Sequence, residues 1–267
     1  MQHVYVIGGG ITGMITGYLK NATVITDSTT FPCWMPVFLW STNATKKFVQ
    51  QLFGDKCDVR TAKARIAFTY NGYLIANDVG RELYSIKVYN TVKQKAACKG
   101  RDEFEYIDIP VQVIYEKLKC KVRQIRDKVV RIDTDQCKIT LASGRELEYT
   151  ELYSTVPLPV FEKLVACKVT TEEYKWLNMY YALNIDCNTK FDYDIRILYV
   201  SDRSPVTRIF NMGNYFVMES LNRLEFGPVM KVINRIGMQE FDSIKLIGRN
   251  AMWDPNIMLH HVIEGVM

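Results

Sequence analysis

Three glycines near the amino end of the chain have the spacing of a turn that holds a dinucleotide. The segment fits the pattern G-x-G-x-x-G and runs Gly8-Gly9-Gly10-Ile11-Thr12-Gly13. In such a turn the first glycine allows a tight bend, the second lets the backbone approach a pyrophosphate, and the third lets helix and strand pack closely. The helix that follows would present free N–H groups to the phosphates. We therefore expect a dinucleotide cofactor to be bound by Gly8, Gly10, Ile11, Thr12 and Gly13.

The segments around these glycines supply the elements that must position them. Residues 3–7 predict a buried strand, residues 11–20 a helix and residues 23–26 a second strand, which together form a βαβ unit. Asp27 comes 19 residues after Gly8, where an acidic side chain is expected to hydrogen-bond the ribose of adenosine. We place Ser28 in the same cofactor-binding set. This motif alone does not separate FAD from NAD.

A second motif, at the other end of the chain, favours FAD. It runs Gly248-Arg249-Asn250-Ala251-Met252-Trp253-Asp254-Pro255-Asn256-Ile257-Met258. It resembles the closing motif of the superfamily of amine oxidases, protoporphyrinogen oxidases and UDP-galactopyranose mutases. In that family a strand ends in a Gly-Arg type pair, a loop with an aromatic residue follows, and the start of a helix faces the flavin side of FAD. The resemblance implies cofactor contacts from Gly248, Arg249, Trp253, Asn256, Ile257 and Met258.

The closing helix itself is predicted over residues 255–266. Asp254 is a natural N-cap, and Pro255 suits the first helical position. N–H groups near residues 256–258 would then meet the ribityl chain, the pyrophosphate or a flavin carbonyl.

Two segments in the middle of the chain carry the same resemblance. Residues 153–159 are similar to the family's strand that runs beside the cofactor, which implies contacts from Thr155 and Pro157. Val122 matches the position whose backbone contacts the adenine.

One segment departs from the family's pattern. Members carry a Gly-rich, Arg-containing loop soon after the second strand, but residues 28–36 contain neither Gly nor Arg. We expect Cys33 or Trp34 near the flavin ring on that side.

The resemblance implies an α/β fold with a Rossmann-like FAD-binding domain of the glutathione reductase type. A second, smaller α+β substrate domain is inserted into it. We assign to the FAD-binding domain residues 1–30, 118–165 and 240–267, and to the substrate or cap domain residues 31–117 and 166–239. Within these, residues 121–156 alternate like a small antiparallel meander, and residues 172–177 predict a helix.

Few residues have the chemistry of a general base or a nucleophile. The three histidines, His3, His260 and His261, occupy predicted scaffold elements. We find no Ser-His-Asp or Cys-His arrangement and no metal-ligand cluster, so no metal is expected. That leaves the flavin as the reactive group, with the protein orienting the substrate.

Arg208 is the first candidate for the substrate site, because the resemblance to mutase-like members places a substrate-facing arginine there. An arginine can hold a carboxylate or phosphate with two parallel hydrogen bonds. Tyr215 and Glu219 follow on a neighbouring predicted strand and would act as an aromatic wall and a carboxylate. Each of the three also has an ordinary structural explanation. Arg208 would be part of a surface ion pair, and Tyr215 and Glu219 would be ordinary residues of the core and its rim.

Composition places the chain among soluble globular proteins. Its 267 residues are 48% hydrophobic and 24% charged, with a net charge of +5. No apolar run approaches the length of about 20 residues that a membrane span needs, and no signal peptide is evident. We expect a cytoplasmic protein without membrane contact. Residues 60–131 hold 16 Lys and Arg against 8 Asp and Glu, so this segment is either a solvated face or a surface for nucleic acid.

These features favour an FAD-dependent enzyme that oxidises or cleaves a C–N bond of an amine or amino-acid-like group. The substrate would be a small molecule or an amine linked to a nucleotide, including a base within nucleic acid. Alternatives are a redox-neutral mutase acting on a nucleotide sugar, and a dinucleotide-binding protein that is non-catalytic or uses NAD.

Overall fold

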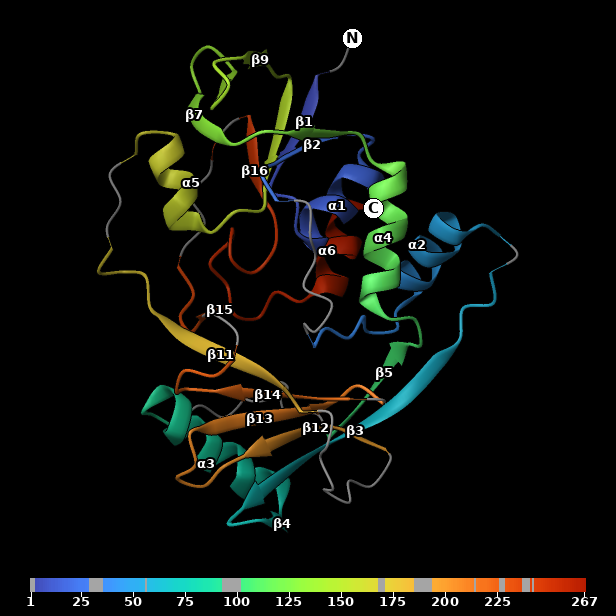
Figure 1. Ribbon diagram of the computed structural model, residues 1–267, viewed down its shortest axis with the longest axis vertical. Coiled ribbons are helices and arrows are strands. Elements are labelled where there is room, and N and C mark those ends of the chain that lie inside the picture. The colour runs from blue at the N-terminus through green and yellow to red at the C-terminus, as the bar shows by residue number, and fades with distance from the viewer. Residues whose placement is uncertain are drawn as a thin grey trace.

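Two sheets organise the chain, as seen in the computed structural model. The structure describes residues 3–28, 36–55, 57–92, 102–167, 171–184, 194–213, 215–225, 229–236, 241 and 243–267. A parallel sheet with its helices forms the upper half of Figure 1, and a larger mixed sheet crosses the lower half. The first strand and the last helix both belong to the upper half (Figure 1).

The parallel sheet has five strands. Their order is β16 (Ile244–Leu246), β10 (Glu151–Ser154), β1 (Val4–Ile7), β2 (Thr23–Thr26) and β6 (Gln124–Arg126), and every neighbouring pair is parallel. β1 lies in the centre and is almost entirely apolar, as a strand covered on both faces must be. This order confirms the predicted βαβ opening.

Four helices cover one face of the parallel sheet. They are α1 (Ile11–Leu19), α2 (Asn43–Phe53), α4 (Val111–Lys121) and α6 (Leu259–Val266). Their apolar side chains share one core with the sheet, in which Met14, Phe48, Ile114 and Ile263 are at most 1% exposed. The amino and carboxyl ends of the chain are therefore joined through a common core.

The opposite face is covered by a meander and one helix. The meander comprises β7 (Val129–Asp133), β8 (Lys138–Leu141) and β9 (Glu146–Glu148), and α5 (Leu158–Leu164) packs beside it. The predicted antiparallel meander is confirmed for residues 129–148, whereas β6 and β10, at the two ends of the predicted range 121–156, belong to the parallel sheet. Trp253 of the closing segment is fully buried in the same core.

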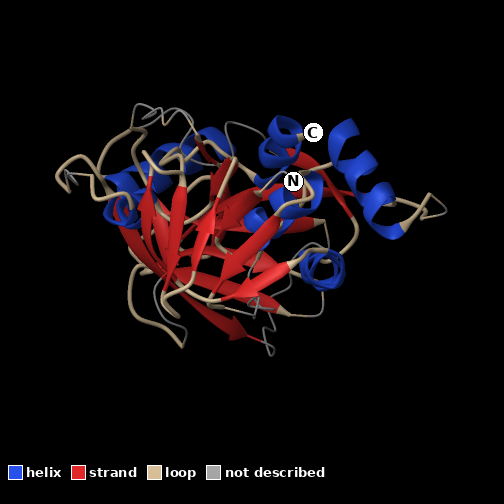
Figure 2. Cartoon of the chain, turned by 90° about the horizontal axis from the view of Figure 1, so that it is seen from above, coloured by secondary structure: helices blue, strands red, loops and turns tan. Residues whose placement is uncertain are grey.

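The second sheet faces the carboxyl ends of the parallel strands. Its order is β15 (Val229–Val232), β11 (Trp176–Asn184), β14 (Phe216–Ser220), β13 (Val206–Asn211), β12 (Ile195–Val200), β3 (Thr61–Tyr70) and β4 (Tyr73–Ile75), and β5 (Glu103–Ile107) also pairs with β3. Helix α3 (Asn77–Tyr89) packs on β3 and β12. Figure 2 shows strands through the middle of the molecule and most of the helices along the upper side of the view.

Two predicted helices differ from the structure. Residues 172–175 form turns, and β11 begins at Trp176, because Trp176–Met179 pairs with β15 across the sheet. The closing helix begins at Leu259 rather than at Pro255. The Asp254 carboxylate caps a turn instead, by accepting a hydrogen bond from the Asn256 N–H at 2.8 Å. Asp254 and Pro255 are residues expected at a helix start, but here they form a single turn that precedes the helix.

The predicted division into two domains stays a prediction, although the packing bears on its boundaries. Helix α2 and the start of α4 fall within residues 31–117, yet they pack in the core of the parallel sheet. They therefore belong with the nucleotide-binding half by contact. None of the helices among the described residues is long and apolar enough to cross a membrane.

The contact between α3 and β3 gives a test of the packing. Gly80 lies inside α3, and a Cβ added there would come within 2.3 Å of the Phe68 Cβ. Replacing a helical glycine by alanine ordinarily stabilises a protein by about 1 kcal/mol. We expect Gly80→Ala to do the opposite and lower the free energy of unfolding by about 1–2 kcal/mol, because overpacking outweighs helix propensity.

Urea unfolding measures this effect, with Gly265→Ala as the matched control. Gly265 is also helical, in α6, and its added Cβ would have no neighbour within 4 Å. That control should be neutral or stabilising by up to about 1 kcal/mol. A stabilising Gly80→Ala would contradict the packing described above.

Candidate functional site

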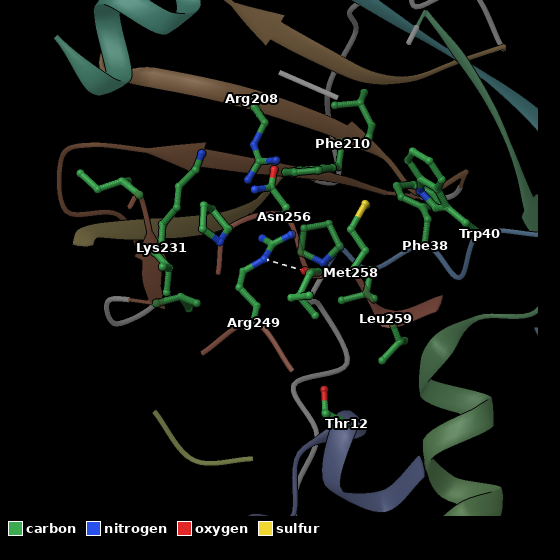
Figure 3. A pocket seen from close by; sticks show the side chains of 18 of the residues that line it. Thr12, Phe38, Trp40, Arg208, Phe210, Lys231, Arg249, Asn256, Met258 and Leu259 are labelled. Carbon is green, nitrogen blue, oxygen red and sulfur yellow. Dashed lines mark hydrogen bonds between the residues drawn. The ribbon is translucent and has the colours of Figure 1, made fainter. Parts of the chain in front are cut away.

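A cavity of about 740 Å³ lies between the two sheets. Its floor is the start of α1, through Ile11 and Thr12, and the closing segment from Pro255 to Leu259. Its roof comes from the second sheet and α3, which contribute tyrosines, Arg208 and Lys231 (Figure 3). The volume lies within the range of about 300–1,000 Å³ that is typical of cofactor and ligand sites.

The glycine-rich turn at the cavity floor has the geometry that its sequence predicts. Gly8 has φ +106°, a left-handed conformation that favours glycine. A Cβ on Gly13 would come within 1.8 Å of the Gly8 carbonyl oxygen, so helix and turn touch through backbone alone. The Thr155 hydroxyl braces the turn by donating to the Ile7 carbonyl at 3.0 Å.

Gly10 differs from the other two glycines of the motif. Its backbone is extended, with φ −68° and ψ 175°, and a Cβ added to it would have no neighbour within 4 Å. Neither backbone strain nor protein packing therefore requires glycine here. Gly10 is also the N-cap of α1, where no side chain accepts a hydrogen bond and the first turn has no acidic residue. The start of α1 is thus open to an anion.

Asp27 and Ser28 lie at the same edge of the sheet as the glycine-rich turn. Both follow the carboxyl end of β2, next to β1, and both are exposed. Ser28 is held by a hydrogen bond from its N–H to the Thr26 hydroxyl at 3.1 Å. This is the edge at which ligands of open α/β sheets bind.

Val122 lies at the opposite edge of the sheet. It precedes β6 and packs near Gly17, far along α1 from the glycine-rich turn, with 7% of its surface exposed. Since the ligand edge is at the carboxyl ends of the strands, the structure does not bring Val122 together with the other predicted cofactor residues. Arg126 and Asp127, at the carboxyl end of β6, lie next to β2 instead.

The closing segment is brought onto the start of α1. Gly248 has φ +92°, and a Cβ on it would lie 2.9 Å from the Thr12 Cγ2. Pro157, the N-cap of α5, is tied to the same segment, since the Leu158 N–H donates to the Asn250 carbonyl at 2.9 Å. The two predicted motifs therefore lie side by side at one edge of the parallel sheet.

The other residues of the closing segment divide into two groups. Arg249, Asn256, Ile257 and Met258 line the cavity, and the Arg249 Nε donates to the Ile257 carbonyl at 3.0 Å (Figure 3). Trp253 does not line it: the side chain is 0% exposed, and its indole N–H donates to Asn234 at 3.2 Å. Trp253 supports the segment from behind, because a residue without accessible surface cannot touch a ligand.

Arg208 and Glu219 form a buried ion pair at the cavity roof. The Arg208 Nε donates to the Glu219 Oε1 at 2.7 Å, and a second hydrogen bond joins Arg208 Nη2 to Oε2. Glu219 also accepts from the Tyr181 hydroxyl at 3.0 Å and the Thr207 hydroxyl at 2.8 Å. Burial would raise the pKa of the Glu219 carboxyl, but the charges of Arg208 and Lys231 hold it well below its usual value.

Tyr215 lies outside the cavity lining. It precedes β14 at the turn after β13, where its carbonyl accepts a hydrogen bond from the Met212 N–H at 3.0 Å. Of the three substrate-site candidates, Arg208 lines the cavity and Glu219 lies directly behind Arg208. Tyr215 belongs to the turn between β13 and β14.

Lys231 is the residue that the sequence analysis missed. It lies on β15, donates to the Tyr84 hydroxyl at 2.9 Å, and lies 3.5 Å from the Glu219 carboxylate. Burial lowers the pKa of its ammonium group, the charge of Arg208 lowers it further, and Glu219 raises it, with a result of about 7. A lysine inside the apolar run Val229–Val232 was the available signal.

Other predictions bear less directly on the cavity. Cys33 and Trp34, which were predicted to lie near the flavin ring, are outside the residues that the structure describes. His260, His261 and Glu264 have ligand atoms within 4.8 Å of one another, a grouping that sequence spacing did not suggest. His261 Nδ1 accepts a hydrogen bond from the Met258 N–H at 3.1 Å, and His260 stacks on Trp40.

The basic segment 60–131 spreads over elements of both sheets, and nucleic acid binding there stays a prediction.

No protein-family model and no curated protein sequence matches the chain, but its fold is similar to solved structures. Reduced UDP-galactopyranose mutase aligns with a TM-score of 0.63 and 12% identity, covering 100% of this chain and 94% of that one. A Photorhabdus luminescens protein assigned as an FAD-containing monooxygenase gives 0.59 and 12%, with 100% and 86% covered. CtdE in complex with FAD and a substrate gives 0.60 and 10%, with 100% and 79% covered.

These similarities show the fold. The α/β fold predicted from the two ends of the chain is the fold that these solved structures share. At 10–12% identity they do not define a substrate or a reaction.

The buried pair at the roof predicts a large loss of stability when its carboxylate is removed. Glu219→Gln leaves Arg208 and Lys231 without their negative partner in a site where the carboxylate is 1% exposed. We expect the free energy of unfolding to fall by about 3 kcal/mol, as when one member of a buried ion pair is removed. Glu151→Gln is the control in urea unfolding: its partner Lys245 is 64% exposed, so the loss should stay below about 1 kcal/mol. Equal losses would contradict the burial described here.

The lowered pKa of Lys231 predicts its reactivity. Above pH 7 the amine is mostly neutral, so the rate of its reductive methylation by formaldehyde and cyanoborohydride should level off near pH 8. An ordinary lysine continues to gain reactivity up to a pKa of about 10.4. Peptide mapping by mass spectrometry across pH 6–10 measures the rate at Lys231 alone. A rate that still climbs above pH 9 would show that the ammonium keeps its usual pKa.

Proposed function

We propose that the chain is a flavoenzyme that binds FAD along the carboxyl edge of the parallel sheet. The adenosine ribose would meet Asp27, the pyrophosphate the start of α1, and the flavin the closing segment and the cavity. Gly10 carries this proposal. Its space is open and its helix start has no side-chain cap, which suits the close approach of a pyrophosphate to the backbone.

The residues at the edge fit the parts of FAD in order. Backbone N–H groups at Ile11 and Thr12 suit phosphate oxygens, and the Asp27 carboxylate suits ribose hydroxyls. The Gly248 contact with Thr12 holds the closing segment against the same helix start. This continuity from Asp27 to Met258 favours an extended dinucleotide over a single nucleotide.

Within this proposal, the reaction is the oxidation or cleavage of a C–N bond in an amine or amino-acid-like substrate. Bound FAD would supply an acceptor for two electrons and a hydrogen from the substrate carbon, which converts an amine into an imine. Lys231, with a pKa of about 7, can accept the proton that a substrate ammonium must lose first. Tyrosines of the cavity wall limit the access of water.

Gly10→Ala tests the cofactor assignment. Because the added methyl would meet no protein atom, thermal unfolding should be unchanged. A methyl group pressed against a bound ligand costs about 1–3 kcal/mol, so the FAD dissociation constant should rise about five- to hundred-fold. Fluorescence quenching of added FAD measures it, and the purified protein should show flavin bands in its visible spectrum.

Gly265→Ala serves as the control, because it adds the same methyl at an open helical position at the carboxyl end of α6. Its FAD affinity should match that of the parent protein. A Gly10→Ala protein that binds FAD normally, or a parent protein without flavin bands after FAD is added, would overturn the proposed function.

The likeness to UDP-galactopyranose mutase favours a second candidate, a redox-neutral reaction on a nucleotide sugar. Anaerobic mixing with a panel of amines separates the two. Bleaching of the flavin bands by an amine supports oxidation, whereas bands that persist with every amine favour the mutase reaction.

A further inference from the structure

Arg249 is a cation in the cavity whose outer donors have no protein partner among the described residues. Its Nε is used, in the hydrogen bond to the Ile257 carbonyl at 3.0 Å. The same bond anchors the guanidinium and leaves both Nη groups facing the cavity. In Figure 3 the side chain extends toward Arg208 and Asn256 and away from Thr12. Its charge therefore points to the substrate side rather than to the start of α1.

Arg208, by contrast, is already occupied. Two parallel hydrogen bonds join it to Glu219, and its guanidinium lies 4.9 Å from the centre of the Phe210 ring. To bind a substrate anion with the same two parallel hydrogen bonds, Arg208 would have to release the Glu219 carboxylate. The anion-binding role that the sequence suggested for Arg208 fits Arg249 better.

The charge balance of the cavity calls for an anion. Among the described residues that line it are Arg208, Arg235, Arg249 and, when its amine is protonated, Lys231, but no Asp or Glu. Glu219, behind the lining, offsets one of these charges, and Asp254 pairs with Arg235 at 3.3 Å. Burial lowers the pKa of the Arg249 guanidinium, and the nearby positive charge of Arg208 lowers it further, because both disfavour the charged form. An incoming anion would relieve that repulsion.

We infer that Arg249 anchors an anion site in this cavity, with Lys231 beside it, and that the substrate carries a carboxylate or a phosphate. The inference rests on the proposed function for the identity of the cavity as the reaction site. The walls beyond this site are aromatic, through Tyr84, Tyr89, Tyr181, Tyr199 and Phe210, so the substrate presents a planar or apolar body behind its anionic group.

Calorimetric titration of the FAD-loaded protein tests the site with three probes of similar shape. Benzoate carries the carboxylate, phenyl phosphate carries the phosphate, and benzamide is the neutral counterpart of benzoate. We expect at least one of the two anions to bind at least ten-fold more tightly than benzamide, and the tighter anion identifies the group that the site takes. Arg249→Gln should weaken the binding of that anion by about ten- to hundred-fold, as the loss of a charged hydrogen-bond partner does.

Arg131→Gln is the matched control, because Arg131 lies on β7 outside the cavity lining, is 69% exposed and is already paired with Asp133. It should change anion affinity less than two-fold. Arg249→Lys keeps the charge without the paired donors, so its affinity should lie between those of the parent and Arg249→Gln. This intermediate value also guards against a general folding defect in the glutamine variant.

Four results would overturn the inference. They are equal binding of benzamide and the anions, no binding of either anion, unchanged anion affinity in Arg249→Gln, and loss of FAD from Arg249→Gln while the parent retains it. The last would assign Arg249 to the cofactor. If the parent itself fails to bind FAD, the proposed function fails, and titration of benzoate and phenyl phosphate into the FAD-free protein still decides whether the anion site exists.

Discussion

The carboxylate of Glu219 holds the roof of the cavity together. It is 1% exposed, and it receives hydrogen bonds or charge from β13, β11 and β15 through Arg208, Tyr181 and Lys231. A buried carboxylate is tolerated only when its lone pairs are satisfied. Three strands that lie at different places in the sequence must therefore be in register for this one group to remain ionised. The same arrangement brings two cations to the surface that faces the cofactor edge.

The cavity is a consequence of how the two sheets face each other. Parallel strands present all their carboxyl ends at one edge, and here that edge faces the second sheet, so the turn after β1 and the segment after β16 become the floor of the site (Figure 1). The floor offers backbone donors and few charges, whereas the roof offers guanidinium, ammonium and phenol groups. In the proposed function the floor would hold the cofactor, and the roof together with Arg249 of the closing segment would face the substrate.

The sequence predicted the elements whose signals are local. The strand–glycine–helix opening and the antiparallel meander depend on residues that are close together in the sequence, and both were found. The closing motif was predicted to contact the same cofactor as the first motif, and Gly248 lies against Thr12 at the start of α1. Such signals can be recognised without knowledge of the fold, because few residues can replace glycine at a crowded or left-handed position.

The errors arose where distant pairing decides the structure. Residues 172–177 have helical spacing, but Trp176 pairs with Val232, 56 positions later in the chain. Lys231 was overlooked for the same reason, since its strand is four residues long and acquires meaning only beside β11. Val122 was matched by pattern, yet its position before β6 decides which edge of the sheet it faces. Pattern identifies a residue type, whereas sheet order decides where that residue lies.

The transfer of the anion-binding role from Arg208 to Arg249 illustrates this difference. An arginine on a predicted strand can bind the substrate, or it can pair with a carboxylate on the neighbouring strand. Cross-strand register settles the choice, because Arg208 lies directly opposite Glu219 on β14. Buried ion pairs add little net stability compared with apolar packing of the same volume. What this pair does contribute is a fixed positive face, since the carboxylate is turned away from the cavity and the cations are turned toward it. An arginine that is paired with its own neighbour therefore contributes to the electrostatic background. Arg249, which has no carboxylate partner among the described residues, is the arginine that we propose recognises a charge on the ligand.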